Sequence, residues 1–267
     1  MTADWLLVAL VAVPLLGAVL VLATPLGDVL AARAGTAITT ATLVLAGLAT
    51  WQAAPFDEPG AGLEVDAPWV PALGMRAHLG LDGVSAPLVL LTALLGVLVC
   101  AHLIRVRPPA ARVRGLVACV LIVVGGAVAT FTALDAFLFF VAFETVLVPM
   151  WFVIAIWGDD SQAGTWSPTS APRPAGEAAR RDAAFRFVLY TAAGSAVMLL
   201  GIVLVVLRAG TSDLVVLASR AGRDLPLGVQ VTAAVLIVLG LAVKAPMFPL
   251  HTWLPPAHTI ADRKSVV

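Results

Sequence analysis

Residues 231–250 read VTAAVLIVLGLAVKAPMFPL, an apolar stretch long enough to cross a membrane that contains a single cation, Lys244. No other lysine occurs among the first 261 residues. A charge at the middle of a bilayer costs about 2.5–3.5 kcal/mol on insertion scales, and ionisable side chains there usually pair or face a water-lined cavity. The stretch therefore predicts a membrane helix with a charged interior, and ion translocation is the leading hypothesis for that charge.

Glu144 is an acid centred in another stretch of this kind. It lies in LDAFLFFVAFETVLVPMWFVIAIW, residues 134–157, about eight residues or roughly 12 Å from the nearer end. If Glu144 and Lys244 lie side by side, the anion favours the charged lysine, and removal of the anion favours release of the lysine's proton. The alternative is that the charges snorkel or form a static ion pair that only stabilises packing.

The composition of the whole chain is that of a polytopic membrane protein. Of the 267 residues, 61% are hydrophobic and 12% are charged, which is more apolar surface than a soluble core of this size can bury. We predict an all-α membrane protein with loops at 54–82 and 158–183 and an amphipathic stretch at 210–228 along the outer surface. Seven transmembrane helices are predicted, at 5–23, 36–53, 83–104, 115–134, 136–157, 184–207 and 229–254.

Three prolines predict interrupted helices beside both buried charges. Pro246 and Pro249 lack an amide hydrogen, so each leaves the carbonyl four residues earlier without its helical partner. Pro149 does the same to the residue that follows Glu144. Irregular backbone at membrane depth is tolerated where it is buried in protein or lines a watery cavity. We therefore expect a proline-broken seventh helix with Lys244 at the break.

The arginines predict the orientation of the spans. In a seven-span arrangement, an excess of Lys and Arg marks the cytoplasmic side, so we place the N-terminus outside. The start of the chain has no early positive residue and is interpreted as a retained span, not a cleaved signal. One side has Arg33, Arg105, Arg107, Arg112, Arg114, Arg173, Arg180, Arg181 and Arg186, and the other has Arg76, Arg208, Arg220 and Arg223.

Polar and aromatic residues near the span ends are further candidates. His251 and His258 follow the break toward the cytoplasm, and an imidazole there can relay protons or only form hydrogen bonds at the interface. Asp135, in the short link after the fourth span, is predicted to be a turn or cap residue. Four tryptophans near span ends are predicted to anchor the spans at the membrane interfaces, namely Trp5, Trp151, Trp157 and Trp253.

The sequence has no recognisable nucleotide, redox or metal motif. Cys100 and Cys119 lie in separate apolar runs, without the paired spacing of a metal site or a disulfide framework. There is no phosphate loop, dinucleotide fingerprint or nucleophile elbow. The formal net charge is +0, which gives no sign of a nucleic-acid partner. We therefore expect no cofactor and no metal in this chain.

Four segments occur in the order and spacing of one known family. They read LGLDGVSAPLVLLTALL from Leu79, FETVLVPMWFVIAIWG from Phe143, FRFVLYTAAGSAVMLLG from Phe185 and VKAPMFPLHTWLPPAHTIA from Val243. Across residues 79–261 the chain resembles the subunit M family of proton-pumping NADH:quinone oxidoreductase, respiratory complex I.

The resemblance implies a subunit of the complex I membrane arm in the bacterial inner membrane, with the other membrane-arm subunits as partners. It implies a fourteen-helix antiporter-like fold, of which this chain would hold the first half. Flavin, iron–sulfur clusters and quinone are expected in partner subunits. In the family, the acid of the FE motif and the lysine of the VK-x-P motif are the functional pair, and here they fall on Glu144 and Lys244. The implied function is proton translocation coupled to quinone reduction by NADH.

Two departures from the family concern the end of the chain. Pro256 stands where the family usually has an aspartate, in the turn after the seventh helix. The last residues, DRKSVV, are polar, and a common sequencing-adapter sequence can encode them in frame. We therefore expect residues 1–261 to be a truncated transmembrane domain and residues 262–267 to be a non-native tail.

Two other functions stay open at this stage. Subunits of sodium/proton antiporters and of energy-converting hydrogenases share the same helix pair, although the segments LVPMWFVIAIWG and HTWLPPAH favour complex I. The third class is a passive scaffold, whose helices hold partner subunits and whose charges only lock the packing.

Overall fold

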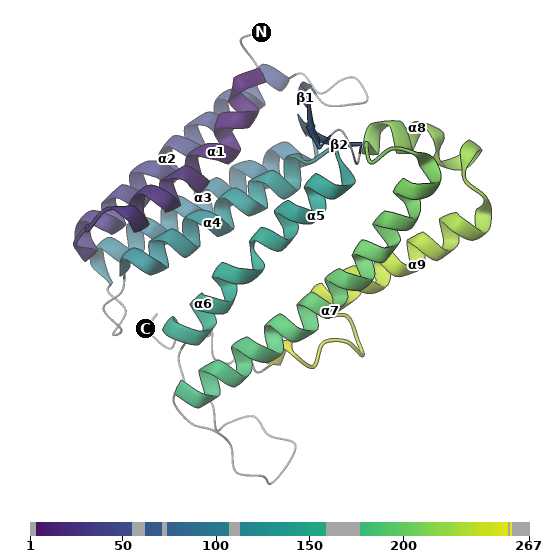
Figure 1. Cartoon of the computed structure of the whole chain (residues 1–267). Helices are drawn as coiled ribbons and strands as arrows, with labels where there is room; N and C mark the ends of the chain where they lie inside the picture. Colours follow the sequence, from purple (N-terminus) through teal and green to yellow (C-terminus); the bar gives the residue numbers. More distant parts are fainter. Residues whose placement is uncertain are drawn as a thin grey trace. The chain divides into compact units, whose positions relative to one another are not determined.

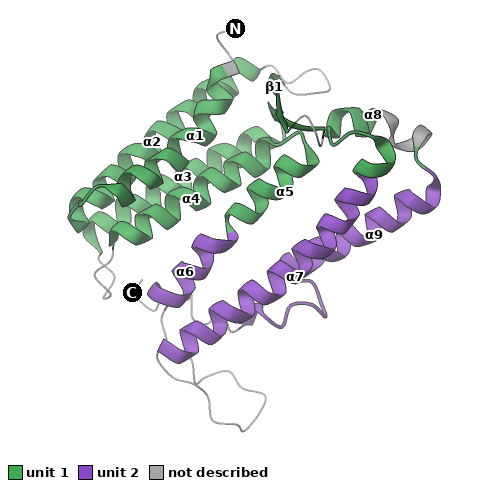
Figure 2. Cartoon of the chain, viewed as in Figure 1, with its two compact units in different colours: residues 1–146, 206–225 green, residues 147–205, 226–267 purple. Residues whose placement is uncertain are grey.

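The computed structural model describes residues 4–54, 62–70, 74–106, 113–158, 177–255 and 257, and Figure 1 shows the elements that they form. The chain divides into two compact units, coloured separately in Figure 2. Unit 1 comprises residues 1–146 and 206–225, and unit 2 comprises residues 147–205 and 226–267. His258, Pro256 and the tail at 262–267 lie outside the described residues.

Seven helices in the described part are long and apolar enough to cross a membrane, which confirms the predicted fold class and number of spans. Five of these spans begin in unit 1, where α2 packs on α3, α1 packs on α4, and α4 packs on α5. These helices are α1 (Asp4–Ala23), α2 (Asp28–Ala53), α3 (Ser85–Arg105), α4 (Val113–Thr132) and α5 (Ala136–Thr145).

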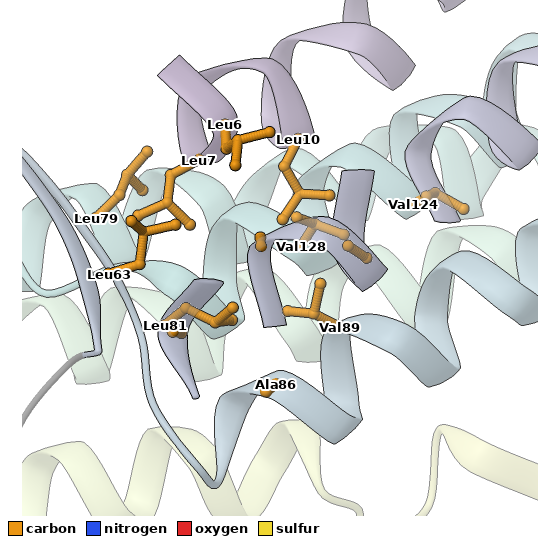
Figure 3. Close-up of a cluster of buried hydrophobic side chains, with 13 residues drawn as sticks. Leu6, Leu7, Leu10, Leu63, Leu79, Leu81, Ala86, Val89, Val124 and Val128 are labelled. Carbon is orange, nitrogen blue, oxygen red and sulfur yellow. The ribbon is translucent and has the colours of Figure 1, made fainter. Parts of the chain in front are cut away.

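The interior of unit 1 is filled by leucine, valine and alanine side chains. Figure 3 shows Leu6, Leu7 and Leu10 of α1 gathered with leucines of a β-hairpin and valines of α3 and α4. Lipid is as apolar as these side chains, so close packing, and not exclusion of water, holds such helices together inside a membrane. The buried members are Leu6, Leu7, Leu10, Ala46, Ala49, Ala53, Leu63, Leu79, Leu81, Ala86, Val89, Val124 and Val128.

The hairpin is formed by β1 (Leu63–Val70) and β2 (Met75–Leu81), which pair antiparallel with Asp66 opposite His78. This segment is predicted to be a loop from the sequence, so the hairpin is an unpredicted addition to the helical fold. Acidic residues and Pro68 obscure the alternation of a strand here, and Pro68 adjoins an irregularity in the register, where proline is tolerated. Gly74 precedes β2 with a φ of 67°, a conformation that favours glycine.

Unit 2 contains α6 (Leu147–Trp157), most of α7 (Glu177–Ala209) and α9 (Leu227–Lys244). α5 and α6 together form one predicted span, which is divided at Val146. The core of unit 2 joins α6 and α7 to the segment that follows α9. Its buried members are Ile154, Ala155, Ala179, Ala183, Ala184, Trp253 and Ala257.

Two helices begin earlier than the predicted spans, because hydropathy marks only the part of a helix that lies in hydrocarbon. α2 begins at Asp28 instead of residue 36, and α7 begins at Glu177 instead of residue 184. The added turns of α7 carry two ion pairs between residues four apart, Glu177–Arg181 at 2.6 Å and Asp182–Arg186 at 2.9 Å. Pairs with this spacing stabilise a solvated helix modestly.

α7 and α9 approach each other closely through glycines. A Cβ added at Gly240 would lie 2.5 Å from the carbonyl oxygen of Gly194, and one added at Gly201 would lie 3.0 Å from the carbonyl oxygen of Ala233. Small residues that allow this approach are typical of interfaces between membrane helices. The contact fixes how α9 lies on α7 one turn before Lys244.

α8 (Leu214–Asp224) is a helix within the amphipathic stretch predicted at 210–228. Asp213 caps its start, because the Asp213 carboxylate accepts a hydrogen bond from the Val216 amide at 2.9 Å. Leu217 is buried and Val215 is exposed. Part of the predicted stretch is therefore a helix, and its place along the outer membrane surface stays a prediction.

Candidate functional site

Lys244 is the last residue of α9, which confirms the predicted helix break. The next residue, Ala245, leaves the helical conformation with φ −85° and ψ 29°. Because Pro246 supplies no amide, the carbonyl of Ala242 accepts a hydrogen bond from the amide of Met247 instead, at 2.9 Å. The chain then continues in turns, so Lys244 stands where the membrane helix unwinds.

Trp253 closes the open end of α9. Its Nε1 donates a hydrogen bond to the carbonyl of Val243 at 2.8 Å, and its ring packs edge-on against Phe187 of α7, with 5.4 Å between the ring centroids. A helix end that loses its own amide donors needs others, and a buried indole N–H supplies one. Trp253 is 6% exposed, so its predicted role as an interface anchor is wrong, whereas Trp5 is exposed as an anchor would be.

Glu144 lies in the last turn of α5, where the second predicted interruption occurs. α5 ends at Thr145 and α6 begins at Leu147. Pro149 sits in the first turn of α6, a position where its missing amide has no helical acceptor to serve. The Thr145 hydroxyl donates to the carbonyl of Val141 at 2.8 Å. Glu144 itself is half-buried.

Gly126 of α4 allows the end of α5 to approach closely. A Cβ added there would lie 2.9 Å from the Val146 side chain and 3.4 Å from the carbonyl oxygen of Ala142. α4 therefore supports the interrupted end of the helix that carries Glu144.

Both predicted charges thus lie at interrupted helix ends and are half-buried, Glu144 in unit 1 and Lys244 in unit 2. The pairing of their side chains stays a prediction. His251, in the turns after α9, is also half-buried, and its Nδ1 is a buried atom without a hydrogen-bond partner among the described residues. Buried polar atoms of this kind are commonly satisfied by water, so His251 suits a hydrated route beside the break.

A second polar site was not predicted from the sequence. It lies in unit 1, where the hairpin meets the α4–α5 link and the α7–α8 link, and main-chain hydrogen bonds join the three segments. The Leu134 amide donates to the carbonyl of His78 at 2.8 Å, and the Leu214 amide donates to the carbonyl of Leu134 at 2.8 Å. We call this site the polar cluster, and its members are Glu64, Asp66, Arg76, His78, Asp135, Ser212 and Asp213.

His78 is the centre of the polar cluster. Its side chain is 3% exposed, and each ring nitrogen faces a carboxylate. Nδ1 lies 2.9 Å from an oxygen of Asp213, and Nε2 is hydrogen-bonded to Glu64, whose side chain is 47% exposed. The cluster therefore connects a partly solvated carboxylate to a buried one through one imidazole.

Asp135 caps α5, which confirms its predicted role. One carboxylate oxygen accepts from the amides of Phe137 and Leu138 at 2.9 Å each. The other accepts from the Ser212 hydroxyl and from the Arg76 amide, the latter at 3.3 Å. Asp135 is fully buried, and these four bonds tie the start of α5 to both the hairpin and the α7–α8 link.

Arg76 and Asp66 form an ion pair on the outer side of the hairpin, with Nε and Nη2 of Arg76 donating at 2.6 and 2.7 Å. These hydrogen bonds lower the pKa of Asp66 below its ordinary value, against an opposing effect of burial, and the charges of His78 and Arg76 act in the same direction. The pair raises the pKa of Arg76, chiefly through the same hydrogen bonds.

Asp82, in the LGLDGVSAP segment, caps the start of α3. Its carboxylate accepts from the amides of Val84 and Ser85 at 3.0 and 2.7 Å. Burial raises the pKa of Asp82, but the hydrogen bonds from Ser85 and Val84 together outweigh burial and leave the pKa lowered. The motif segment at this position therefore contributes a helix cap rather than a catalytic acid.

Three members of the polar cluster, Asp66, His78 and Asp213, have ligand atoms within 4.8 Å of one another, the spacing that a metal ion requires. However, both oxygens of Asp66 bind Arg76, and both nitrogens of His78 are already hydrogen-bonded. The cluster thus meets its own hydrogen-bonding needs. The cap pattern that marks Asp135 in the sequence could also have marked Asp213, but nothing local shows that the links carrying them meet at His78.

Comparisons with known proteins support the relationship that the four motif segments indicate. A family model described as NADH:quinone oxidoreductase/Mrp antiporter, TM, matches residues 175–263. NADH-quinone oxidoreductase subunit M of Rhodobacter capsulatus is 35% identical over 234 residues, which cover 83% of this chain and 41% of that protein. The subunit M of Escherichia coli K12 is 34% identical over 222 residues, covering 81% and 38%.

The chain is a homologue of subunit M. It belongs with the antiporter-like membrane subunits of complex I and spans about two fifths of the length of these curated relatives. A chain of respiratory complex I from Thermus thermophilus superposes with a TM-score of 0.72 at 27% identity, covering 94% of this chain and 46% of that one. A chain of the Mrp complex from Dietzia sp. has a TM-score of 0.71 at 24% identity, which shows the shared fold alone.

Proposed function

We propose that this subunit M homologue translocates protons in the membrane arm of a bacterial NADH:quinone oxidoreductase, with Glu144 and Lys244 as the proton-transfer pair. The observation that carries the proposal is that α9 ends at Lys244, inside an apolar stretch. A helix inside a membrane does not unwind at a lysine unless protein or water forms hydrogen bonds with the backbone groups that lose their helical partners. The homology to subunit M supports the function proposed for that site.

In the proposed mechanism Glu144 stabilises the ammonium form of Lys244 when the two side chains are close. When the carboxylate is neutralised or withdrawn, a desolvated ammonium tends to release its proton. His251, with its unpartnered buried nitrogen, is the candidate acceptor beside the break, and His258 is the next candidate along the chain. Electron transfer would take place in partner subunits, which would hold flavin, iron–sulfur clusters and quinone.

The test is mutagenesis in the complete subunit, assembled in its complex in membrane vesicles. Glu144→Gln and Lys244→Ala should each lower NADH-driven proton pumping per electron at least about tenfold, because each removes a proton-carrying group from the path. Glu177→Gln is the matched control, since Glu177 is an exposed acid in an ion pair with Arg181 and lies outside the proposed path. Normal pumping per electron in an assembled Glu144→Gln complex would favour the passive scaffold instead.

The alternative proposal is a subunit of a sodium/proton antiporter or of an energy-converting hydrogenase. The superposition on the Mrp complex covers 98% of this chain, so the fold is shared with that group. The identity to subunit M of two bacteria favours complex I. The genes that neighbour this one decide between them: a run of NADH dehydrogenase subunits is expected, and a cation-antiporter cluster would overturn the proposal.

A further inference from the structure

We propose that His78 is a protonation-dependent latch that holds the start of α5, the helix that carries Glu144, against the α7–α8 link. The inference deepens the proposed function and rests on it, because it concerns how the Glu144 helix is held in place. His78 touches no proton on the proposed path, so it is a positioning residue.

The protonation state of His78 decides how many hydrogen bonds its imidazole can donate. Both ring nitrogens of His78 face carboxylates, Asp213 at 2.9 Å and Glu64 on the other side. A neutral imidazole has one N–H, and an imidazolium has two. Only the protonated ring can donate to both carboxylates, whereas the neutral ring turns a lone pair toward one of them.

Besides His78, the polar cluster contains four carboxylates and one cation. Glu64 and Asp66 approach from β1, Asp135 from the α4–α5 link, and Asp213 from the start of α8, while Arg76 is the cation on β2. Arg76 binds both oxygens of Asp66. Protonated His78 is therefore the side-chain cation that the described contacts offer to Glu64 and Asp213. The neutral ring keeps one N–H, so it can donate to only one of the two carboxylates, and the buried Asp213 then has the amide of Val216 and at most an uncharged donor on His78.

Hydrogen bonds through the α7–α8 link connect His78 to the start of α5. Asp213 is bound to His78, and the preceding residue, Ser212, donates its hydroxyl to Asp135. The Ser212 carbonyl also accepts the amide of Ala136, the first residue of α5, at 2.9 Å. Two consecutive residues of the α7–α8 link thus bind the hairpin and the cap of the Glu144 helix. When His78 loses its charge, its hydrogen bond to Asp213 is weakened or lost, and the hold on Asp135 weakens with it, because hydrogen bonds between charged groups are the stronger ones.

The direction of the pH dependence follows from these contacts. The latch is closed when His78 is protonated, and it opens when a rise in pH removes that proton. Opening frees the start of α5, and Glu144 lies about two turns further along the same helix.

The test uses the complete subunit in its complex, in membrane vesicles, with proton pumping per electron measured as the pH is varied on the side of the hairpin. We expect the wild-type ratio to fall at least about threefold as the pH is raised, and His78→Gln, which cannot be protonated, to give a low ratio at every pH. The matched control is His102→Gln at the exposed end of α3, which should keep the wild-type profile. A wild-type profile in His78→Gln, or a flat profile in the wild type, would overturn the latch.

A second measurement keeps the proposal testable if His78→Gln fails to assemble. Amide hydrogen exchange of the wild type, corrected for the intrinsic effect of pH, should become roughly tenfold faster at Leu134, Ala136 and Leu214 as the latch opens. Unchanged protection at these amides contradicts the latch. Failure of the proposed function is distinguishable, because it appears as normal pumping in Glu144→Gln, whereas failure of the latch alone leaves Glu144→Gln inactive.

Discussion

Asp135 shows how much one carboxylate can organise in a membrane protein. It is fully buried, and its two oxygens accept four hydrogen bonds from α5, the hairpin and the α7–α8 link. The sequence alone predicted the cap, because an aspartate in a short link before an apolar helix is a familiar pattern. It could not predict the partners Ser212 and Arg76, which come from distant parts of the chain.

We predict that Asp135→Ala lowers the free energy of unfolding by about 2 kcal/mol or more. The substitution removes a helix cap and leaves the buried Ser212 hydroxyl without its acceptor on α5. Thermal or denaturant unfolding in detergent measures the change. Asp28→Ala is the control, since Asp28 also lies in a first helical turn, but the start of α2 has no side-chain cap. Equal losses in the two variants would contradict the role given to Asp135.

Also at the residue scale, Arg76 lowers the pKa of Asp66. Because the pKa of Asp66 is lowered, the ion pair contributes stability above the ordinary value of 3.8 and loses it as the pH falls through the folded value. Arg76→Gln should therefore raise the pKa of Asp66, and a carboxyl-carbon NMR titration measures it. An unchanged titration in that variant would show that Arg76 is not the cause.

At the scale of elements, hydropathy located the membrane helices because the requirement for apolar length is local. It could not find the hairpin, whose strands are short and polar on one side and depend on packing against the helix ends. The prolines predicted the breaks at Lys244 and after Glu144, because proline lacks an amide wherever it occurs. The aromatic-belt pattern misjudged Trp253, because its indole binds a carbonyl that only the folded turn brings close.

The α7–α9 contact predicts opposite effects for two glycines of one helix. Gly240→Ala places a Cβ 2.5 Å from a backbone oxygen of α7, so the helices must separate at a cost of about 1–3 kcal/mol. Gly228→Ala meets nothing within 4 Å and should be neutral or stabilising by up to about 1 kcal/mol. Melting temperatures of the two variants measure the difference, and similar values would contradict the close contact.

Trp253→Phe tests the closure of α9 while retaining an aromatic ring against Phe187. We expect a loss of about 1–2 kcal/mol, because the carbonyl of Val243 is left without its donor. The same substitution at Trp51, which is 83% exposed, should change stability little. Chemical unfolding of the two variants decides, and equal losses would mean that the Trp253 hydrogen bond contributes little.

At the scale of the molecule, the contacts within unit 1 agree with a chain whose successive helices cross the membrane in opposite directions. The hairpin, the α4–α5 link and the α7–α8 link are predicted to lie on one side, and main-chain hydrogen bonds join them. At the other ends of the helices, Arg114 of α4 donates to the carbonyl of Thr24, in the α1–α2 link, at 3.0 Å. The arginine count had placed these two positions together on the cytoplasmic side.

This orientation predicts which cysteines a membrane-impermeant maleimide reaches in intact cells. With Cys100 and Cys119 replaced, Ala67→Cys in the hairpin should be labelled from outside, and Glu177→Cys at the start of α7 only after permeabilisation. The assay reads the labelled fraction of each variant, and the reverse pattern would invert the proposed topology. Both positions are exposed, so burial does not explain a difference between them.

The hydrogen-bonded indole of Trp253 also provides an intrinsic fluorescence probe beside Lys244. Emission from a buried, hydrogen-bonded tryptophan responds to wetting of its surroundings, and Trp253 is held by the residue that precedes the lysine. With the other six of the seven tryptophans replaced by phenylalanine, the colour and lifetime of its fluorescence would follow water and motion at the end of α9 during turnover, with no attached dye.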